Sequence, residues 1–178
     1  MPTFWPPRTS ICWKTAMLAP VRTVPPTGMP VSLAEAKAHL RVDHDDEDTI
    51  IMALVDAAVG YLDGWTGILG RCLEEQEWRQ DFDGFSACLR LPLWPVISVS
   101  SLVWRNGTGQ VATISSDNYA LKSDARGAYV RFRNDFVYPG DLYETGAVVV
   151  TYWAGYPRQG VVEADPNAEP PVEADPGT

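Results

Sequence analysis

The stretch Pro30–Asp43, PVSLAEAKAHLRVD, determines how the rest of the sequence is interpreted. Ser32 and Glu35 stand three residues apart, which is the spacing of a capping box, where each side chain bonds the other residue's backbone N–H at a helix start. Three apolar residues then recur on one helical face: Leu33, Ala36 and Leu40. The pattern predicts a short helix that begins after Ser32 and ends near Arg41–Val42.

A second, longer helix is predicted directly after the first. Acidic side chains, which the positive end of a helix dipole favours, gather at its beginning: Asp43, Asp45, Asp46, Glu47 and Asp48. A stripe with the 3.6-residue period follows: Ile51, Leu54, Val55, Ala58, Tyr61, Leu62 and Trp65. Two amphipathic helices joined by a few residues predict a helical hairpin over residues 30–70.

After Gly70 the apolar pattern changes to the period of two that is typical of strands. The predicted strands are Leu73–Phe82, Leu89–Leu93, Ile97–Arg105, Gln110–Ile114, Ala128–Arg133 and Ala147–Trp153. A slip of parity at Ser100–Ser101 predicts a β-bulge, and Asn106–Gly107 predicts a hairpin turn. The last strand is nearly all apolar, so we expect it to be central in its sheet.

These elements predict an α+β fold, with an N-terminal helical hairpin followed by a small antiparallel β-sheet or barrel. Residues 71–157 are expected to form that β region of five to seven strands, packed on the helices. Residues 1–29 are proline-rich and show no periodicity, which predicts an extended arm. Met17 is an alternative start of translation, and residues 1–16 are then a mis-called start.

Residues 158–178 form an acidic, proline-rich tail in which VEADP occurs twice, at Val162–Pro166 and Val172–Pro176. A segment of this composition buries too little apolar surface to offset the entropy lost on ordering, so we expect disorder. The whole chain has a formal net charge of −9. That charge argues against tight nucleic-acid binding, which requires a footprint of Lys and Arg.

Signatures of catalysis and of cofactor binding are absent from the sequence. There is no GxxxxGK[ST], GxGxxG or GxSxG motif. His44 lies among Asp43, Asp45 and Asp48, but the spacing fits neither a calcium loop nor a zinc motif. No apolar run reaches the length of a membrane-spanning helix. We therefore predict no catalytic residue, no cofactor, no metal site and no membrane partner.

Five residues are candidates for an interface with other chains. Trp94 lies between two prolines and is predicted to sit on a surface turn, where an aromatic side chain suits an interface. Arg131 and Arg133 form a basic stripe on one strand face, which is either solvated or paired with a neighbour's acidic surface. Trp153 and Tyr156 complete the set, although core packing also accounts for a strand tryptophan.

The order of these features resembles the head–tail connector proteins of long-tailed phages and prophages, also called adaptor or head-completion proteins. The resemblance covers roughly residues 24–157 and begins with PVSLAEAKAHLRVD, an acidic linker and a helix ending in Thr66-Gly67. It continues through LRLPLWPVISVSSLVW, Asp117-Asn118-Tyr119 and AVVVTYWAGY. It departs after Tyr156, where family members continue into an amphipathic helix and this chain has Pro157 and the acidic repeats.

The resemblance implies a structural subunit in the neck of a virion, assembled in the host cytoplasm. It implies a ring of twelve copies beneath the portal protein, which would extend the DNA channel without sequence-specific binding and dock the next tail or stopper component. Two alternatives stay open. One is another small neck or tail protein of the virion, and the other is a small acidic hydrolase or sugar-binding domain with a cleft at Trp94.

Overall fold

Eight antiparallel strands form two sheets within residues 16–157, the part of the chain that the computed structural model describes. The five-stranded sheet has the order β1 (Val21–Val24), β2 (Gln76–Phe82), β8 (Val148–Ala154), β4 (Val96–Arg105) and β5 (Val111–Thr113). The three-stranded sheet has the order β3 (Cys88–Arg90), β7 (Gly127–Phe132) and β6 (Tyr119–Asp124). A single 3₁₀ turn, Ser116–Asn118, precedes β6.

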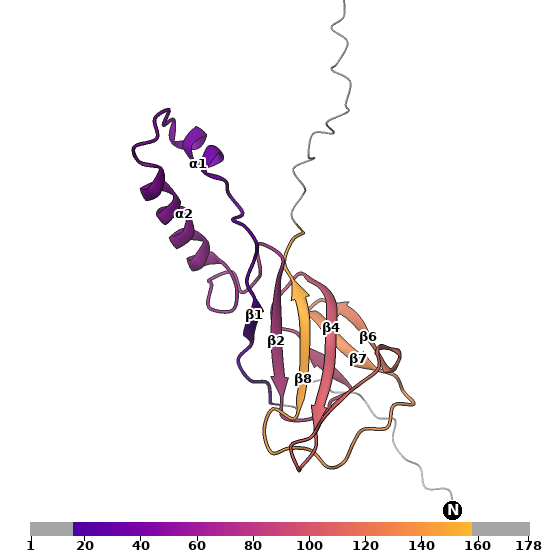
Figure 1. Cartoon of the computed structure of the whole chain (residues 1–178). Helices are drawn as coiled ribbons and strands as arrows, with labels where there is room; N and C mark the ends of the chain where they lie inside the picture. Colours follow the sequence, from indigo (N-terminus) through magenta and orange to yellow (C-terminus); the bar gives the residue numbers. More distant parts are fainter. Residues whose placement is uncertain (1–15, 158–178) are drawn as a thin grey trace, which may run out of the picture.

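The two sheets share one apolar core, so they form a sandwich with β6 and β7 behind β8 and β4 (Figure 1). Alternate residues of β2 and β8 point into this core, as the period of two requires. Its largest fully buried apolar side chains come from both sheets and the segments beside them: Tyr152, Leu89, Leu93, Leu102, Val130, Val148 and Val150. We call this sandwich the β-body.

The two helices, α1 (Leu33–Leu40) and α2 (Asp48–Leu62), form a hairpin that projects from one end of the β-body (Figure 1). The predicted capping box is confirmed: the Glu35 N–H donates to Ser32 Oγ, and the Ser32 N–H donates to Glu35 Oε2 at 2.8 Å. At its other end α1 stops at Arg41, whose left-handed backbone (φ 59°) turns the chain toward α2.

The predicted α+β class is confirmed, and two finer expectations are not met. The hairpin is not the first element, because β1 precedes it and pairs with β2 at an edge of the larger sheet. The strands also form two open sheets and no closed barrel. All four β1 residues are exposed, so backbone pairing with β2 alone holds this strand in place. Its sequence has no buried apolar alternation from which a strand could be predicted.

The core of the β-body contains no residue of the helices. Ile51 is the single buried residue of α1 and α2. The predicted bulge is confirmed, because the β4–β8 register shifts between Val99 and Ser101. The expected arm before residue 16 and the disordered tail after residue 157 lie outside the described residues.

Candidate assembly surfaces

The hairpin exposes most of its apolar side chains. Apart from Asp48, α2 carries one charged residue, Asp56. A helix that is apolar on all sides is normally buried in a larger body, yet the side chains of Leu54 and Tyr61 are 64% and 66% exposed. The exposed apolar residues of the hairpin and of the turn that follows it define the hairpin surface: Leu40, Ile50, Leu54, Tyr61, Trp65, Ile68 and Leu69.

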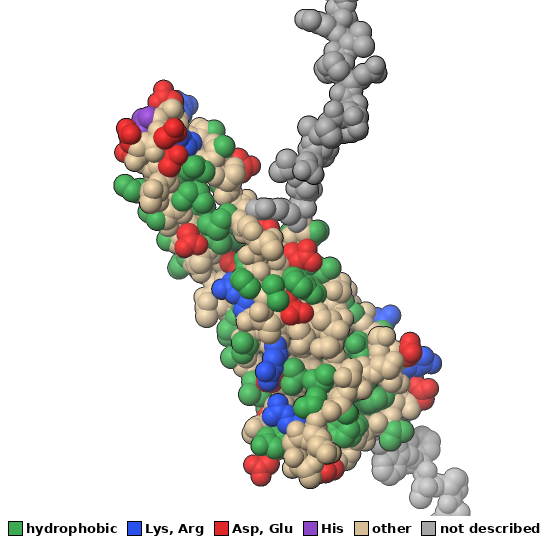
Figure 2. Space-filling view, in the orientation of Figure 1, with side chains coloured by type: hydrophobic (Ala, Val, Ile, Leu, Met, Phe, Trp, Pro, Cys, Tyr) green, Lys and Arg blue, Asp and Glu red, His purple; other side chains and the backbone are tan. Residues whose placement is uncertain are grey.

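An ion-pair cluster holds the tip of the hairpin together. Lys37 of α1 places Nζ 2.6 Å from Asp45 Oδ1 and 2.7 Å from Asp48 Oδ1, which ties the first helix to the start of the second. The hydrogen bonds that Lys37 donates to these carboxylates raise its pKa, and Lys37 in turn lowers the pKa of Asp45. Figure 2 shows acidic side chains gathered at this tip and apolar ones along the hairpin below it.

Asp63, the residue that caps the end of α2, anchors the hairpin to the β-body. Its side chain is 8% exposed, and its Oδ1 accepts from the Leu73 N–H at 2.7 Å. The Gln76 amide donates to both carboxylate oxygens, and the Arg22 guanidinium lies 3.8 Å away. The hairpin base is therefore fixed to β1 and β2 through one buried carboxylate.

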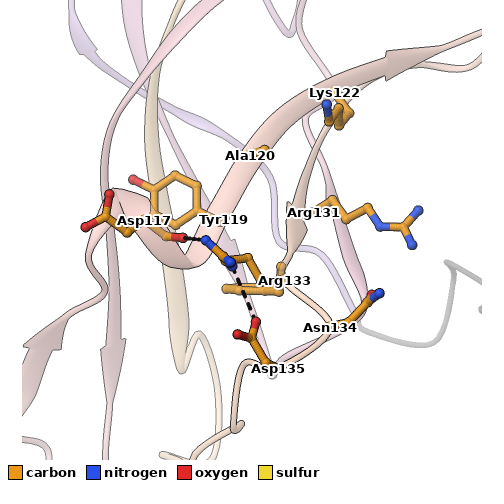
Figure 3. Close-up of a pocket in the computed structure, with 9 residues that line it drawn as sticks. Asp117, Tyr119, Ala120, Lys122, Arg131, Arg133, Asn134 and Asp135 are labelled. Carbon is orange, nitrogen blue, oxygen red and sulfur yellow. Dashed lines mark hydrogen bonds and ion pairs between the residues drawn. The ribbon is translucent and has the colours of Figure 1, made fainter.

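The outer face of the three-stranded sheet is basic. Arg131 of β7 lies opposite Ala120 of β6, and Lys122 lies two pairs further along, opposite Tyr129 and on the same face of the sheet. Four cations on this side define the basic face: Arg90, Lys122, Arg131 and Arg133. Three of them, Lys122, Arg131 and Arg133, line a cavity of about 550 Å³ (Figure 3).

Only part of this positive charge is neutralised within the described residues. Arg90 donates to both oxygens of Asp124 at 3.0 and 2.7 Å, and this contact lowers the pKa of Asp124 to about 2. Arg133 lies 3.4 Å from Asp135, an exposed and loose pair. Lys122 and Arg131 make no ion pair with any residue in the described range.

The five residues predicted as an interface do not form one surface. Trp94 is 41% exposed, and the Arg71 guanidinium lies 3.9 Å from its ring centroid. Tyr156 is 47% exposed and follows Gly155, whose N–H donates to Pro95 O at 2.8 Å, so it lies near Trp94. Trp153 is half-buried on β8, beside Glu77 and Ser98. Arg131 belongs to the other sheet, and Arg133 follows just past the end of β7.

Two parts of these surfaces were missed from the sequence. Lys122 belongs to β6, a strand whose apolar alternation is too weak to predict it, so its place beside Arg131 could not be inferred. The exposure of the hairpin surface was missed because a helical stripe of apolar residues looks the same whether its own chain or another one covers it. The signal that could have revealed it is the nearly uniform apolarity of α2.

The hydrolase alternative requires two close carboxylates beside Trp94. The cavity that Trp94 lines contains one, Asp124, which is held by Arg90. Within residues 16–157 no group of His, Cys, Asp and Glu side chains is arranged to hold a metal ion. None of the helices in the same range is long and apolar enough to cross a membrane.

A β-sandwich with its own core and a projecting, exposed apolar hairpin is the class of architecture that these observations define. Within it, residues 30–83 match the model of the family described as Phage gp6-like head-tail connector protein. The match spans the whole hairpin and β2, so the resemblance to head–tail connector proteins is confirmed over that segment.

Solved structures show the same fold at low sequence identity. A chain in the "Neck of empty GTA particle computed with C6 symmetry" is similar with a TM-score of 0.62 and 18% identity, covering 79% of this chain and 72% of that one. A chain in the "Virion of native gene transfer agent (GTA) particle" gives a TM-score of 0.58 and 20% identity, covering 79% and 73%. None of the curated proteins compared with the chain matches it.

Proposed function

We propose that this chain is a structural head–tail connector subunit in the neck of a tailed phage, prophage or gene-transfer particle. The observation that carries the proposal is the hairpin surface, which lies within the segment that matches the connector family. In the isolated chain this apolar surface is exposed to water. Its burial requires contact with a neighbouring chain. The subunit acts by assembly and has no catalytic role.

In this proposal the copies form a closed ring of twelve beneath the portal, and hairpins pack against adjacent subunits. The ring extends the DNA channel and docks the next tail or stopper component. The negative charge of the chain supports this role, because like charge keeps passing DNA from adhering to the wall. The similar chains come from the neck and the virion of gene transfer agent particles, which agrees with that location.

The proposal is tested in particles made by the strain that carries the gene. The full-length chain is expected in purified particles at twelve copies, as a ring at the neck in electron micrographs. Leu54→Glu places a charge within the hairpin surface and is expected to give filled heads without tails. Val111→Glu is the matched control, because Val111 is 62% exposed on β5 of the β-body, outside the hairpin.

Particles that lack this chain altogether would contradict the proposal. A stoichiometry of six or fewer, or a position along the tail, would favour the alternative of another small neck or tail protein. Normal particles from Leu54→Glu would show that the hairpin surface is not an assembly surface.

A further inference from the structure

We propose that the basic face binds the acidic repeat segment of the same chain, residues 162–176. The inference is independent of the proposed function, because it concerns the charges of one chain alone. The basic face and the acidic segment carry opposite charges. The basic face carries Arg90, Lys122, Arg131 and Arg133. Residues 161–178 carry five acids and no base: Glu163, Asp165, Glu169, Glu173 and Asp175.

The basic face has unused capacity for carboxylates. Of its four cations, Arg90 is fully engaged with Asp124, whereas Lys122 and Arg131 have no ion pair in the described range and Arg133 has one loose pair. In Figure 3, Lys122 and Arg131 project from neighbouring strands with no interaction drawn to either of them. The adjoining cavity of about 550 Å³ is large enough to receive side chains of an extended segment.

Both segments carry pairs of charges two residues apart. Arg131, on β7, and Arg133, one residue past the end of that strand, project in different directions and line the same cavity (Figure 3). Glu163 and Asp165 have the same two-residue spacing, and Glu173 and Asp175 repeat it. Each VEADP unit therefore offers two carboxylates, which equals the number of guanidinium groups beside the cavity. Each unit can form charge-assisted hydrogen bonds, which arginine makes with carboxylates in a preferred planar geometry.

The tail also begins within reach of the basic face. The Gly155 N–H donates to Pro95 O, and Pro95 lines a cavity together with the β6–β7 turn, Asp124–Gly127. From Gly127 to Arg133 the strand advances about 20 Å. Eight residues separate Pro157 from Asp165 and span up to about 28 Å when extended. The first VEADP unit can therefore reach Arg131 and Arg133 within its own chain.

Binding of the acidic tail would neutralise the positive charge of the basic face. The basic face gathers four cations, and phosphate groups of nucleic acid would otherwise be attracted to it. Exposed ion pairs are each weak and are screened by salt. Several of them on one tethered segment act together, because the tether keeps the effective concentration high.

Carbodiimide cross-linking of the full-length chain tests this inference, because the reagent joins a carboxylate to a lysine only when the two are in contact. Lys122 is expected to form products with Glu163, Asp165, Glu173 or Asp175 at low salt, identified by mass spectrometry. Mixing ¹⁴N- and ¹⁵N-labelled chains shows whether a product joins one chain or two, and products within one chain are expected. The Lys37–Asp45 pair, at 2.6 Å, is the internal positive control.

Matched variants separate binding from chance encounter. The double variant Arg131→Gln, Arg133→Gln is expected to lower the yield of Lys122–tail products about fivefold, as the loss of two exposed ion pairs implies. Arg41→Gln removes a charge at the hairpin and is expected to leave that yield unchanged. If the double variant gave the same yield of Lys122–tail products as Arg41→Gln, the inference would be overturned. Absence of the products, with DNA-dependent protection of Lys122 from acetylation, would instead assign the face to nucleic acid.

Discussion

The β-body and the hairpin use similar apolar residues in opposite ways. In the β-body, strand residues such as Leu102 and Tyr152 are fully buried in a core that both sheets complete. In the hairpin, Leu54 and Tyr61 remain in water, and Ile51 alone is buried. The β-body is thus stabilised by its own packing, whereas the hairpin depends on local hydrogen bonds, the Lys37 ion pairs and the Asp63 anchor.

The difference implies that the two regions have different stabilities in the isolated chain. Apolar burial contributes about 25 cal/mol per Å² removed from water, and a helix gains little of it until a neighbour covers its faces. Local opening of the hairpin is therefore expected to require less free energy than unfolding of the β-body.

Truncating one leucine in each region gives the largest expected contrast. Leu102→Ala removes a fully buried side chain and should lower the free energy of unfolding by about 3 kcal/mol, through lost burial and the remaining cavity. Leu54→Ala removes an exposed side chain and should cost less than about 0.5 kcal/mol in the isolated chain. Urea unfolding of both variants measures this, and equal losses would mean that the hairpin is packed in solution.

Removal of the anchor is expected to have the next largest effect. Asp63→Ala leaves the Leu73 N–H and the Gln76 amide without their buried acceptor, which should cost about 2 kcal/mol. Asp135→Ala is the control, because its exposed pair with Arg133 should contribute less than about 0.5 kcal/mol. Denaturant midpoints compare the two, and similar values would show that Asp63 does not fix the hairpin to the β-body.

Alkaline pH should lower the free energy of unfolding of the β-body. Burial raises the pKa of the Cys72 thiol to about 12 and also raises the pKa of Tyr152, so the core admits only their neutral forms. Stability is therefore complete below the ordinary thiol pKa of 9.0 and falls as the pH rises from there toward 12. Unfolding free energies at pH 8 and pH 10.5 should show the loss, and Cys72→Ala should make the decline shallower.

The smallest effect is expected at Gly60, in the interior of α2. Nothing lies within 4 Å of the position that a Cβ would take, so alanine fits and should stabilise the helix by up to about 1 kcal/mol. Amide hydrogen exchange in the hairpin should slow by up to about fivefold, while exchange in the β-body stays the same. Faster hairpin exchange would indicate a contact at Gly60 that the isolated chain does not show.

Elements that depend on a few neighbouring residues were predicted from the sequence, and elements that depend on pairing were not. The capping box at Ser32, the Asn106–Gly107 turn, the bulge near Ser100 and the central position of β8 follow from patterns within a few residues, and all are confirmed. The edge strand β1 was missed because its four exposed residues are held only by backbone pairing with β2.

The candidate surfaces were predictable only in part. Arg131 and Arg133 were identified because they alternate with apolar residues along the predicted strand Ala128–Arg133. Lys122 and Arg90 lie beside them because β6 and β3 pair with β7. The sequence pattern of one segment does not predict which strands pair. The role of Trp94, Arg131, Arg133, Trp153 and Tyr156 as an interface stays a prediction.

The central place of β8 has a consequence for the order of folding. This strand pairs with β2 and β4, which precede it by some 70 and 50 residues, so the larger sheet cannot close until β8 has left the ribosome. The hairpin depends on short-range contacts and can form much earlier. For that interval the nascent chain displays an apolar helix beside unpaired strand edges, a combination prone to aggregation. Expression yield should therefore depend on how quickly residues 148–154 are synthesised.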